Sequence, residues 1–253
     1  MAAEPTTSAF LFADLAGYTA LTEAHGDAEA AEIAVEFVAR VREMIPDYGC
    51  ELVKTIGDAV MVRLDDPGQA IDLGLRIVDE LAQPGQPPVR VGVHCGPAVP
   101  HEGDWFGGTV NLASRVTGAA RVGEVLITEA TRRCLGRDGY DLEPRGEHRF
   151  RHIVDPVRVY RVIGGGGAGH HLEIDPVCWM AVDPKAPFAT RRHRGATYRF
   201  CSAECERAFM ANPGRYAAEA GARTVSQRSL LIALGGFLAV GVIAAVVGRR
   251  AVS

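Results

Sequence analysis

The feature that most constrains this chain is a glycine-rich run, GGGGAG, at residues 164–169. Glycine loses more backbone entropy on folding than any other residue, so a segment of this composition does not form a core element. We therefore expect a flexible linker over residues 164–171. The linker divides the 253 residues into a larger domain before it and a smaller domain after it.

The overall composition is that of an ordinary globular protein, and it excludes several classes. Hydrophobic residues make up 47% of the chain and charged residues 23%, which excludes a wholly disordered, collagen-like or coiled-coil protein. The formal net charge is −4, so the chain lacks the global basic signature of nucleic-acid binding, and we expect no nucleic-acid partner. Six cysteines are too few for the disulfide framework of a small secreted scaffold.

The larger domain, residues 8–163, alternates strand and helix patterns. Apolar residues recur at helical spacing over residues 27–44, where Asp27 is a candidate N-cap, and over residues 67–82. The other expected elements are hairpin strands at 50–55 and 59–64, strands at 8–15, 89–95, 125–128, 148–153 and 157–162, and helices at 111–119 and 129–135. This order predicts an α+β fold with helices on one face of a mainly antiparallel sheet.

Two aspartates stand out from this apolar pattern. Asp14 closes the strand-like run FLFAD, and Asp58 lies in the turn of KTIGDAVM. If the two strands are neighbours, the carboxylates meet at one edge of the sheet, where hard oxygen ligands suit Mg²⁺ or Mn²⁺ and a phosphate substrate. Taken singly, Asp14 also fits a helix cap and Asp58 a hairpin-turn residue, and the residues alone leave both interpretations open.

Four motifs follow one another in the order and at the separations of one family. They are FADLAGYT at 12–19, VKTIGDAVM at 53–61, VRVGVHCGPAV at 89–99 and GDWFGGTVNLASRV at 103–116. With these motifs the larger domain resembles the catalytic domain of the class III nucleotidyl cyclases. The resemblance implies a ferredoxin-like cyclase fold, conversion of ATP to 3′,5′-cyclic AMP and pyrophosphate, and two Mg²⁺ or Mn²⁺ ions per site. It also implies a homodimer, because the family divides its site between two subunits and this chain has one copy of each part.

The resemblance assigns metal and base-reading roles to matching positions. Asp14 and Asp58 match the metal-binding aspartates, and the Leu15 carbonyl matches a minor metal ligand. Lys54 and Asp104 match the pair that reads the purine. A lysine and an aspartate together imply adenine, because lysine donates to a ring nitrogen and the carboxylate accepts from the exocyclic amine.

The remaining assigned roles concern the transition state and the phosphates. Asn111 and Arg115 match the pair that supports the transition state; four positions apart, they share a helix face. Arg115 would stabilise charge on the α-phosphate while Asn111 holds the ribose. Arg151 stands where the family commonly has a phosphate-binding lysine, and arginine keeps the charge but changes the geometry. The alternative for Arg151 is an outward-facing strand residue.

After the linker, residues 172–217 carry three cysteines with the spacing of a metal site. Cys178, Cys201 and Cys205 follow the pattern C-x22-C-x3-C, and Ser202 is the candidate N-cap of a helix. Their thiolates would form a soft site for Zn²⁺ or Cu⁺. A domain of about 45 residues also needs a staple, which favours a metal over three unligated thiols in a small core.

The same segment resembles the YHS domain, a small metal-binding module related to the TRASH family. The matching pieces include DPVC, FCSAEC and NPGRY. The sequence departs from the family at Trp179, where glycine is usual, and a bulky indole there is expected to alter the loop shape or metal access. His170, His171 and His193 are candidates for a fourth ligand, and each also fits a surface histidine.

A third segment, residues 229–248, reads SLLIALGGFLAVGVIAAVVG without a charge or a proline. Twenty residues at 1.5 Å per residue span roughly 30 Å, the thickness of the bilayer core. We expect a single transmembrane helix that anchors the chain in the membrane, with the cyclase domain in the cytoplasm because ATP is cytosolic. A buried core helix is the alternative interpretation.

These expectations combine into one leading hypothesis and one alternative. The leading hypothesis is a membrane-anchored adenylate cyclase whose YHS-like module tunes its activity or location. A glycine linker transmits torque poorly, so we expect any regulation to act through dimer proximity. The alternative is a non-catalytic nucleotide-binding or metal-sensing module, for which Arg151 is the only support in the sequence.

Overall fold

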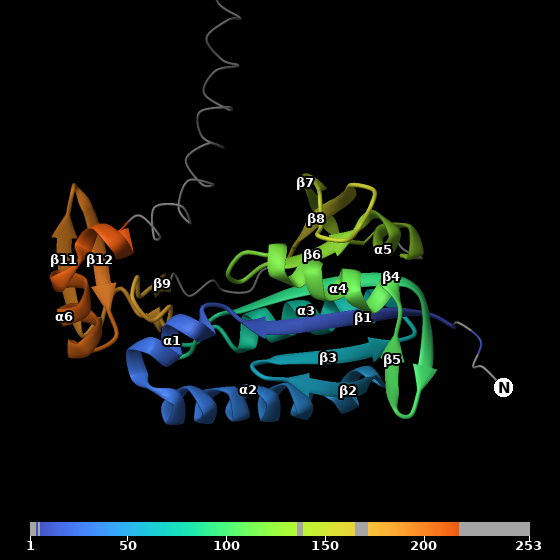
Figure 1. Cartoon of the computed structure of the whole chain (residues 1–253), viewed down its shortest axis with the longest axis horizontal. Coiled ribbons are helices and arrows are strands. Elements are labelled where there is room, and N and C mark those ends of the chain that lie inside the picture. The colour runs from blue at the N-terminus through green and yellow to red at the C-terminus, as the bar shows by residue number, and fades with distance from the viewer. Residues whose placement is uncertain (1–3, 5, 136–138, 165–171, 218–253) are drawn as a thin grey trace, which may run out of the picture.

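The computed structural model of the chain (Figure 1) describes residues 4, 6–135, 139–164 and 172–217. The predicted membrane helix at 229–248 lies outside the described residues, as do His170 and His171. Among the helices that are described, none is both long enough and apolar enough to cross a bilayer.

The larger domain begins with a split βαββαβ unit. Its elements, in chain order, are β1 (Thr6–Leu15), α1 (Tyr18–His25), α2 (Asp27–Tyr48), β2 (Glu51–Ile56), β3 (Ala59–Leu64), α3 (Pro67–Glu80) and β4 (Val89–His101). The strands lie in the order β2-β3-β1-β4, and β1 is antiparallel to both of its neighbours. This is the ferredoxin-like arrangement that the resemblance implied.

A second group of elements extends the sheet beyond β4. They are β5 (Asp104–Phe106), α4 (Gly108–Ala119), β6 (Val125–Thr128), α5 (Glu129–Cys134), β7 (Asp141–His148) and β8 (Val157–Ile163). The extension runs β4-β6-β8-β7, and β5 pairs with the end of β4. Only the β4–β6 pair is parallel, so the sheet is mostly antiparallel, as expected.

Helices cover both faces of this sheet, and the prediction of helices on one face was wrong. Leu11 of β1 packs in the buried cluster that contains Phe37 of α2 and Ile77 of α3. Its neighbour Phe10 faces the other way and packs in a separate cluster with Val110 of α4. The reason is topological: β4 and β6 are parallel, so their connection must cross a face of the sheet, and α4 is that crossover.

Most of the predicted elements are confirmed, and the differences have local causes. Gly26, not Asp27, is the N-cap of α2, and Asp27 is its first residue. The strand predicted at 148–153 is wrong, because β7 ends at His148 and a turn follows. In that turn His152 has a φ of 63° and the Ile153 amide donates to the Phe150 carbonyl at 3.0 Å.

The described part of the smaller domain contains two short hairpins, a helix and, at residues 213–217, a further helical segment. Its elements are β9 (Glu173–Ile174), β10 (Ala181–Val182), β11 (Ala189–His193), β12 (Ala196–Phe200) and α6 (Ala203–Ala211). Phe200 and Phe209 form its buried centre, with ring centroids 5.2 Å apart. Ser202 caps α6 as predicted, since its side chain accepts from the Cys205 amide at 3.2 Å.

The two domains contact each other directly, beside α1 and the loop before β4 (Figure 1). The Gly85 amide donates to the Ala181 carbonyl at 2.8 Å, and the Ala181 amide donates to the Gln86 carbonyl at 2.9 Å. Buried side chains of the smaller domain, including Met180, belong to the same apolar cluster as α2 and α3. The glycine linker therefore joins two domains that are also held together by packing and backbone hydrogen bonds.

Candidate active site and metal centre

Asp14 and Asp58 come together at one edge of the sheet, as the sequence predicted. Asp14 of β1 pairs with Ala59 at the start of β3, and the Leu15 amide donates to the Asp58 carbonyl at 3.3 Å. Burial, and then the neighbouring Asp14 carboxylate, raise the pKa of Asp58 to about 6. Two half-buried carboxylates that repel each other in this way form an oxygen-donor pair that fits a divalent cation.

Sequence reasoning missed a third member of this group, Arg90 of β4. The β1–β4 register places Arg90 opposite Asp14, and its Nε donates to Asp14 Oδ2 at 2.9 Å. The signal in the sequence was a lone charge in the apolar strand VRVGVHC, but the partner follows only from the strand register. The side chain of Leu15 is buried and carries no donor atom, so a metal could use only its backbone carbonyl.

Lys54 and Asp104 form the second predicted pair. Lys54 lies on β2 and Asp104 opens β5, and Lys54 Nζ is 2.5 Å from Asp104 Oδ2. The hydrogen bond from Lys54 lowers the pKa of Asp104, so the carboxylate stays charged and available as an acceptor. The second oxygen of Asp104 accepts from the Trp105 amide at 2.7 Å, which fixes the carboxylate plane.

Asn111 and Arg115 lie one turn apart on α4, the helix whose buried face packs on the sheet. Asn111 is exposed and Arg115 is half-buried. Among the described residues, neither side chain has a hydrogen-bond or ion-pair partner. The two are thus placed on one helix as predicted, but they do not bond to the aspartates or to the Lys54–Asp104 pair within this chain.

Arg151 lies in the turn between β7 and β8 and is exposed. The alternative of an outward-facing strand residue is wrong, because the strand ends before it. A turn position leaves the guanidinium free to reorient, so its proposed contact with phosphate stays a prediction.

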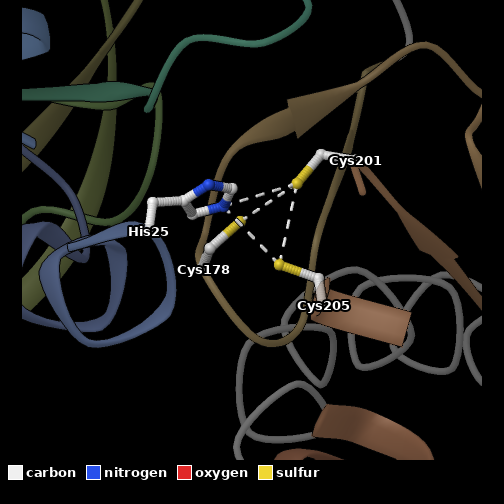
Figure 2. Close-up of side chains that lie close together, drawn as sticks. All are labelled: His25, Cys178, Cys201 and Cys205. Atoms are coloured by element: carbon white, nitrogen blue, oxygen red, sulfur yellow. Dashed lines mark hydrogen bonds between the residues drawn. The ribbon is translucent and has the colours of Figure 1, made fainter. Parts of the chain in front are cut away.

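The three cysteines of the smaller domain converge, and a fourth side chain joins them from the larger domain (Figure 2). Cys201 Sγ lies 3.4 Å from Cys178 Sγ and 3.7 Å from Cys205 Sγ. His25 Nε2 lies 3.6 Å from Cys205 Sγ and 3.8 Å from Cys201 Sγ. His193, the described candidate from the sequence, is not in this group, whereas His25 was missed altogether.

The three thiols perturb one another. All three cysteines are free thiols rather than disulfides. Hydrogen bonds to the other two sulfurs, with burial, raise the pKa of Cys178, and the pKa of Cys201 is raised as well. Hydrogen bonds from Cys178 and Cys201 lower the pKa of Cys205. Soft sulfur donors of this kind fit Zn²⁺ or Cu⁺ and not Mg²⁺.

The fold, the paired carboxylates and the Lys–Asp pair define a nucleotide cyclase domain. Residues 2–164 match the family described as the adenylate and guanylate cyclase catalytic domain, and the chain belongs to this family. Residues 174–220 match the YHS domain.

Two relatives that are described as adenylate cyclases are similar to this chain. Over 170 residues the chain is 39% identical to a pH-sensitive adenylate cyclase of Mycobacterium tuberculosis, covering 62% of this chain and 42% of that protein. It is 38% identical over 129 residues to an adenylate cyclase of Streptomyces griseus, covering 51% of this chain and 32% of that protein. The chain therefore spans less than half the length of these relatives.

Solved structures share the fold. An adenylate cyclase of Trypanosoma brucei in its monomeric state superposes with a TM-score of 0.57 at 25% identity, covering 62% of this chain and 87% of that one. An adenylate/guanylate cyclase/hydrolase of Silicibacter pomeroyi superposes with a TM-score of 0.57 at 26% identity, covering 64% of this chain and 99% of that one.

Proposed function

We propose that this chain is an adenylate cyclase that converts ATP to 3′,5′-cyclic AMP and pyrophosphate. The observation that carries the proposal is the convergence of the Asp14–Asp58 carboxylates and of the Lys54–Asp104 pair, each from separate strands. The similarity to proteins named adenylate cyclase supports the same activity.

In the proposed reaction the ribose 3′-hydroxyl loses its proton to water and its oxygen attacks the α-phosphorus. The bond from that phosphorus to the bridging oxygen breaks, and pyrophosphate leaves. Two Mg²⁺ or Mn²⁺ ions at Asp14, Asp58 and the Leu15 carbonyl would neutralise the phosphates and lower the pKa of the 3′-hydroxyl. Arg90 donates only to Oδ2 of Asp14 in this structure, which leaves Oδ1 for a cation. The guanidinium of Arg90 would also offset part of the charge of the carboxylate pair.

Base selection is assigned to Lys54 and Asp104. Their ion pair is only partly buried, with side chains 36% and 28% exposed, so solvent and a base can reach both groups. Adenine would be recognised when the ammonium donates to a ring nitrogen and the carboxylate accepts from the 6-amino group. Guanine presents a carbonyl oxygen where adenine has the amine, and this acceptor would face the Asp104 carboxylate unfavourably.

The proposed active form is a homodimer with two sites. Asn111 and Arg115 carry out transition-state roles in the proposal, yet within one chain they bond to none of the metal or base residues. A second copy that brings its own α4 to the carboxylate edge would complete each site. Arg151, exposed in the β7–β8 turn, is proposed to contact the triphosphate.

Two further proposals concern the rest of the chain. Residues 229–248 are proposed to form one transmembrane helix that leaves the catalytic domain in the cytoplasm. The thiols of Cys178, Cys201 and Cys205 are proposed to bind Zn²⁺ or Cu⁺ in the YHS domain.

The test of the catalytic proposal is cyclic nucleotide production by the full chain in membranes, with ATP or GTP and with Mg²⁺ or Mn²⁺. We expect cyclic AMP from the wild type and none from Asp14→Ala. Asp79→Ala, an exposed position on α3, is the matched control and should retain activity. A folded, dimeric wild type that binds ATP without turnover would overturn the proposal in favour of a non-catalytic nucleotide-binding module.

A further inference from the structure

Four metal-binding atoms from two domains lie together beside the end of α1. Cys178, Cys201 and Cys205 supply three sulfurs, and His25, the last residue of α1, supplies Nε2 (Figure 2). All four atoms lie within 4.8 Å of one another. The described histidine of the YHS domain, His193, lies outside this group.

The separations match the edges of a tetrahedral metal site. With Zn–S of about 2.3 Å and Zn–N of about 2.0–2.1 Å, the ideal edges are about 3.8 Å between sulfurs and about 3.5 Å between sulfur and nitrogen. Two of the sulfur–nitrogen edges are 3.6 and 3.8 Å, and one sulfur–sulfur edge is 3.7 Å. Of these four edges the Cys178–Cys201 edge, at 3.4 Å, departs most, and it is still far longer than the roughly 2.05 Å of a disulfide.

The orientation of His25 is set by a carboxylate on its far side. Nδ1 of His25 lies 3.2 Å from Glu29 Oε1, one turn further along the chain. When Nδ1 carries the proton, the N–H group donates to Glu29 and the lone pair of Nε2 faces the sulfurs. A carboxylate that holds the second nitrogen is the usual outer partner of metal-binding histidines, and it fixes both the tautomer and the ring plane.

The cysteine loops are also held in place by hydrogen bonds to neighbouring side chains. Asp175 is fully buried and accepts hydrogen bonds from the Cys201 amide and the Val177 amide, both at 2.8 Å. The Ser202 cap accepts from the Cys205 amide. These bonds fix the backbone on both sides of the cluster, so little reorganisation is needed to close four ligands on one ion.

An entry route is open beside the cluster. A groove of about 610 Å³ lies between α2 and the YHS domain, with His25 and Cys201 in its lining. Glu32, Glu36 and Glu204 also line it, so the approach is negatively charged and favours cations.

We propose that His25 completes a Cys₃His site for a four-coordinate d¹⁰ cation, with Zn²⁺ as the fitting ion, and that binding locks the YHS domain onto α1. The proposal rests on metal binding by the three cysteines and adds a ligand from the catalytic domain. Its consequence follows from chain connectivity: α1 begins at Tyr18, four positions after the Asp14 carboxylate. Metal occupancy would thus hold the segment that follows a catalytic-site aspartate.

The first experiment uses the full chain with Zn²⁺, and with Co²⁺ as the spectroscopic probe. We expect one metal per chain and a tetrahedral Co²⁺ spectrum with thiolate charge-transfer bands. His25→Ala should shift the ligand-field bands and weaken Zn²⁺ binding by at least about 10- to 100-fold. His25→Cys should restore tight four-coordinate binding, and Cys178→Ser should lose a thiolate band. His193→Ala is the matched control and should leave spectrum and affinity unchanged.

Two results would overturn the proposal in distinguishable ways. If His25→Ala keeps the wild-type spectrum and affinity while Cys178→Ser loses them, the site is confined to the YHS domain and only the inter-domain ligand is wrong. A site of two or three thiolates without His25 is also the coordination expected if the ion bound there is Cu⁺. If the wild type binds no metal under reducing conditions, both the inference and the proposed metal role fail, while cyclic AMP formation tests the catalytic proposal separately.

A second experiment measures whether metal binding holds the YHS domain on α1. Amide hydrogen exchange of the wild type should slow on Zn²⁺ binding both in residues 178–205 and in α1 (Tyr18–His25). In His25→Ala, metal should still protect residues 178–205 but no longer protect α1. Equal protection of α1 in both proteins would contradict a metal-dependent lock.

Discussion

The two candidate metal centres of this molecule obtain their ligands in opposite ways. Asp14 lies at the end of β1 and Asp58 lies in the turn just before the neighbouring strand β3, so the pairing of these two strands brings their carboxylates together. His25 and Cys201 are 176 positions apart and belong to different domains. The first centre exists as soon as the cyclase sheet forms, whereas the second exists only when the YHS domain packs beside α1.

The two centres also differ in their donor atoms. The carboxylate pair offers hard oxygen ligands that suit Mg²⁺ or Mn²⁺, while three sulfurs and an imidazole suit Zn²⁺ or Cu⁺. The centres should therefore fill independently from the same solution. Yet α1 starts just after Asp14 and ends at His25, so one short helix connects them. The two centres therefore suit different classes of metal ion, while α1 connects them along the chain.

The largest expected effect tests whether the centres are chemically separate. Asp58→Asn removes the charge of a proposed metal ligand but keeps the side-chain shape. We expect cyclic AMP formation to fall by about 100-fold or more, since several kcal/mol of charge stabilisation are lost. The Co²⁺ spectrum of the sulfur site should stay unchanged, and Asp79→Asn should keep full activity. A shifted Co²⁺ spectrum in Asp58→Asn would mean that the centres are not independent.

The next effect concerns base selectivity at the proposed cyclase site, beside the hard-metal centre. Replacing both Lys54→Glu and Asp104→Cys removes the donor and the acceptor that fit adenine. We expect the ratio of kcat/KM for ATP over GTP to fall by at least about 100-fold, because unmatched polar groups reject a base strongly. Lys185→Glu, an exposed change in the YHS domain, is the matched control. An unchanged ratio in the double variant would remove the pair from base recognition.

The carboxylate centre was predictable because its information is local. Asp14 and Asp58 each sit at a strand end, and a short hairpin plus one pairing brings them together. Lys54 and Asp104 were reached through the motif match. Arg90 was missed, because its contact depends on the register of a strand 76 positions away.

The sulfur centre was predictable only in part. The three cysteines carry a recognisable spacing, but His25 lies in a short helix with Leu21 as its one buried residue. A pattern with so few apolar positions gives no helical period to detect. A histidine followed by Gly26 also fits an ordinary helix end, which favours a structural interpretation. The position of α4 on the second face of the sheet was missed for a similar reason. Sequence patterns predict the types of the elements, but the parallel pairing that requires a crossover is a tertiary property.

A third prediction compares His25 with His94, a histidine buried in the sheet. His94 lies on β4, and its Nδ1 is 2.7 Å from Thr128 Oγ1. Burial lowers the pKa of His94 from 6.5 to about 4. In the unfolded chain the imidazole protonates first as the pH falls, so stability is present above pH 6.5 and is lost between pH 6.5 and about 4.

His94→Gln should flatten this loss, which is about 3 kcal/mol of unfolding free energy across that window. Chemical denaturation at several pH values measures it. A His101→Gln control, at an exposed position on β4, should keep the wild-type slope. If His94→Gln keeps the slope, other groups carry the pH dependence.

The smallest expected effect lies at the contact that connects the centres. Trp179 has a φ of 70°, a region that costs a non-glycine residue about 1 kcal/mol or more. It packs on Gly17, where an added Cβ would lie 2.3 Å from Trp179 Cγ. In Trp179→Gly the relieved strain opposes the lost packing, so the net change in stability should stay within about 1 kcal/mol.

A double-variant cycle isolates this contact. Gly17→Ala alone is expected to destabilise the chain by at least about 2 kcal/mol, because it meets both the indole and a φ of +81°. In the Trp179→Gly background the clash is absent and only the backbone strain remains, about 1 kcal/mol. Denaturant unfolding of the four proteins should therefore show a coupling of about 1 kcal/mol between the two positions. Additive effects would mean that the indole does not press on the segment after Asp14.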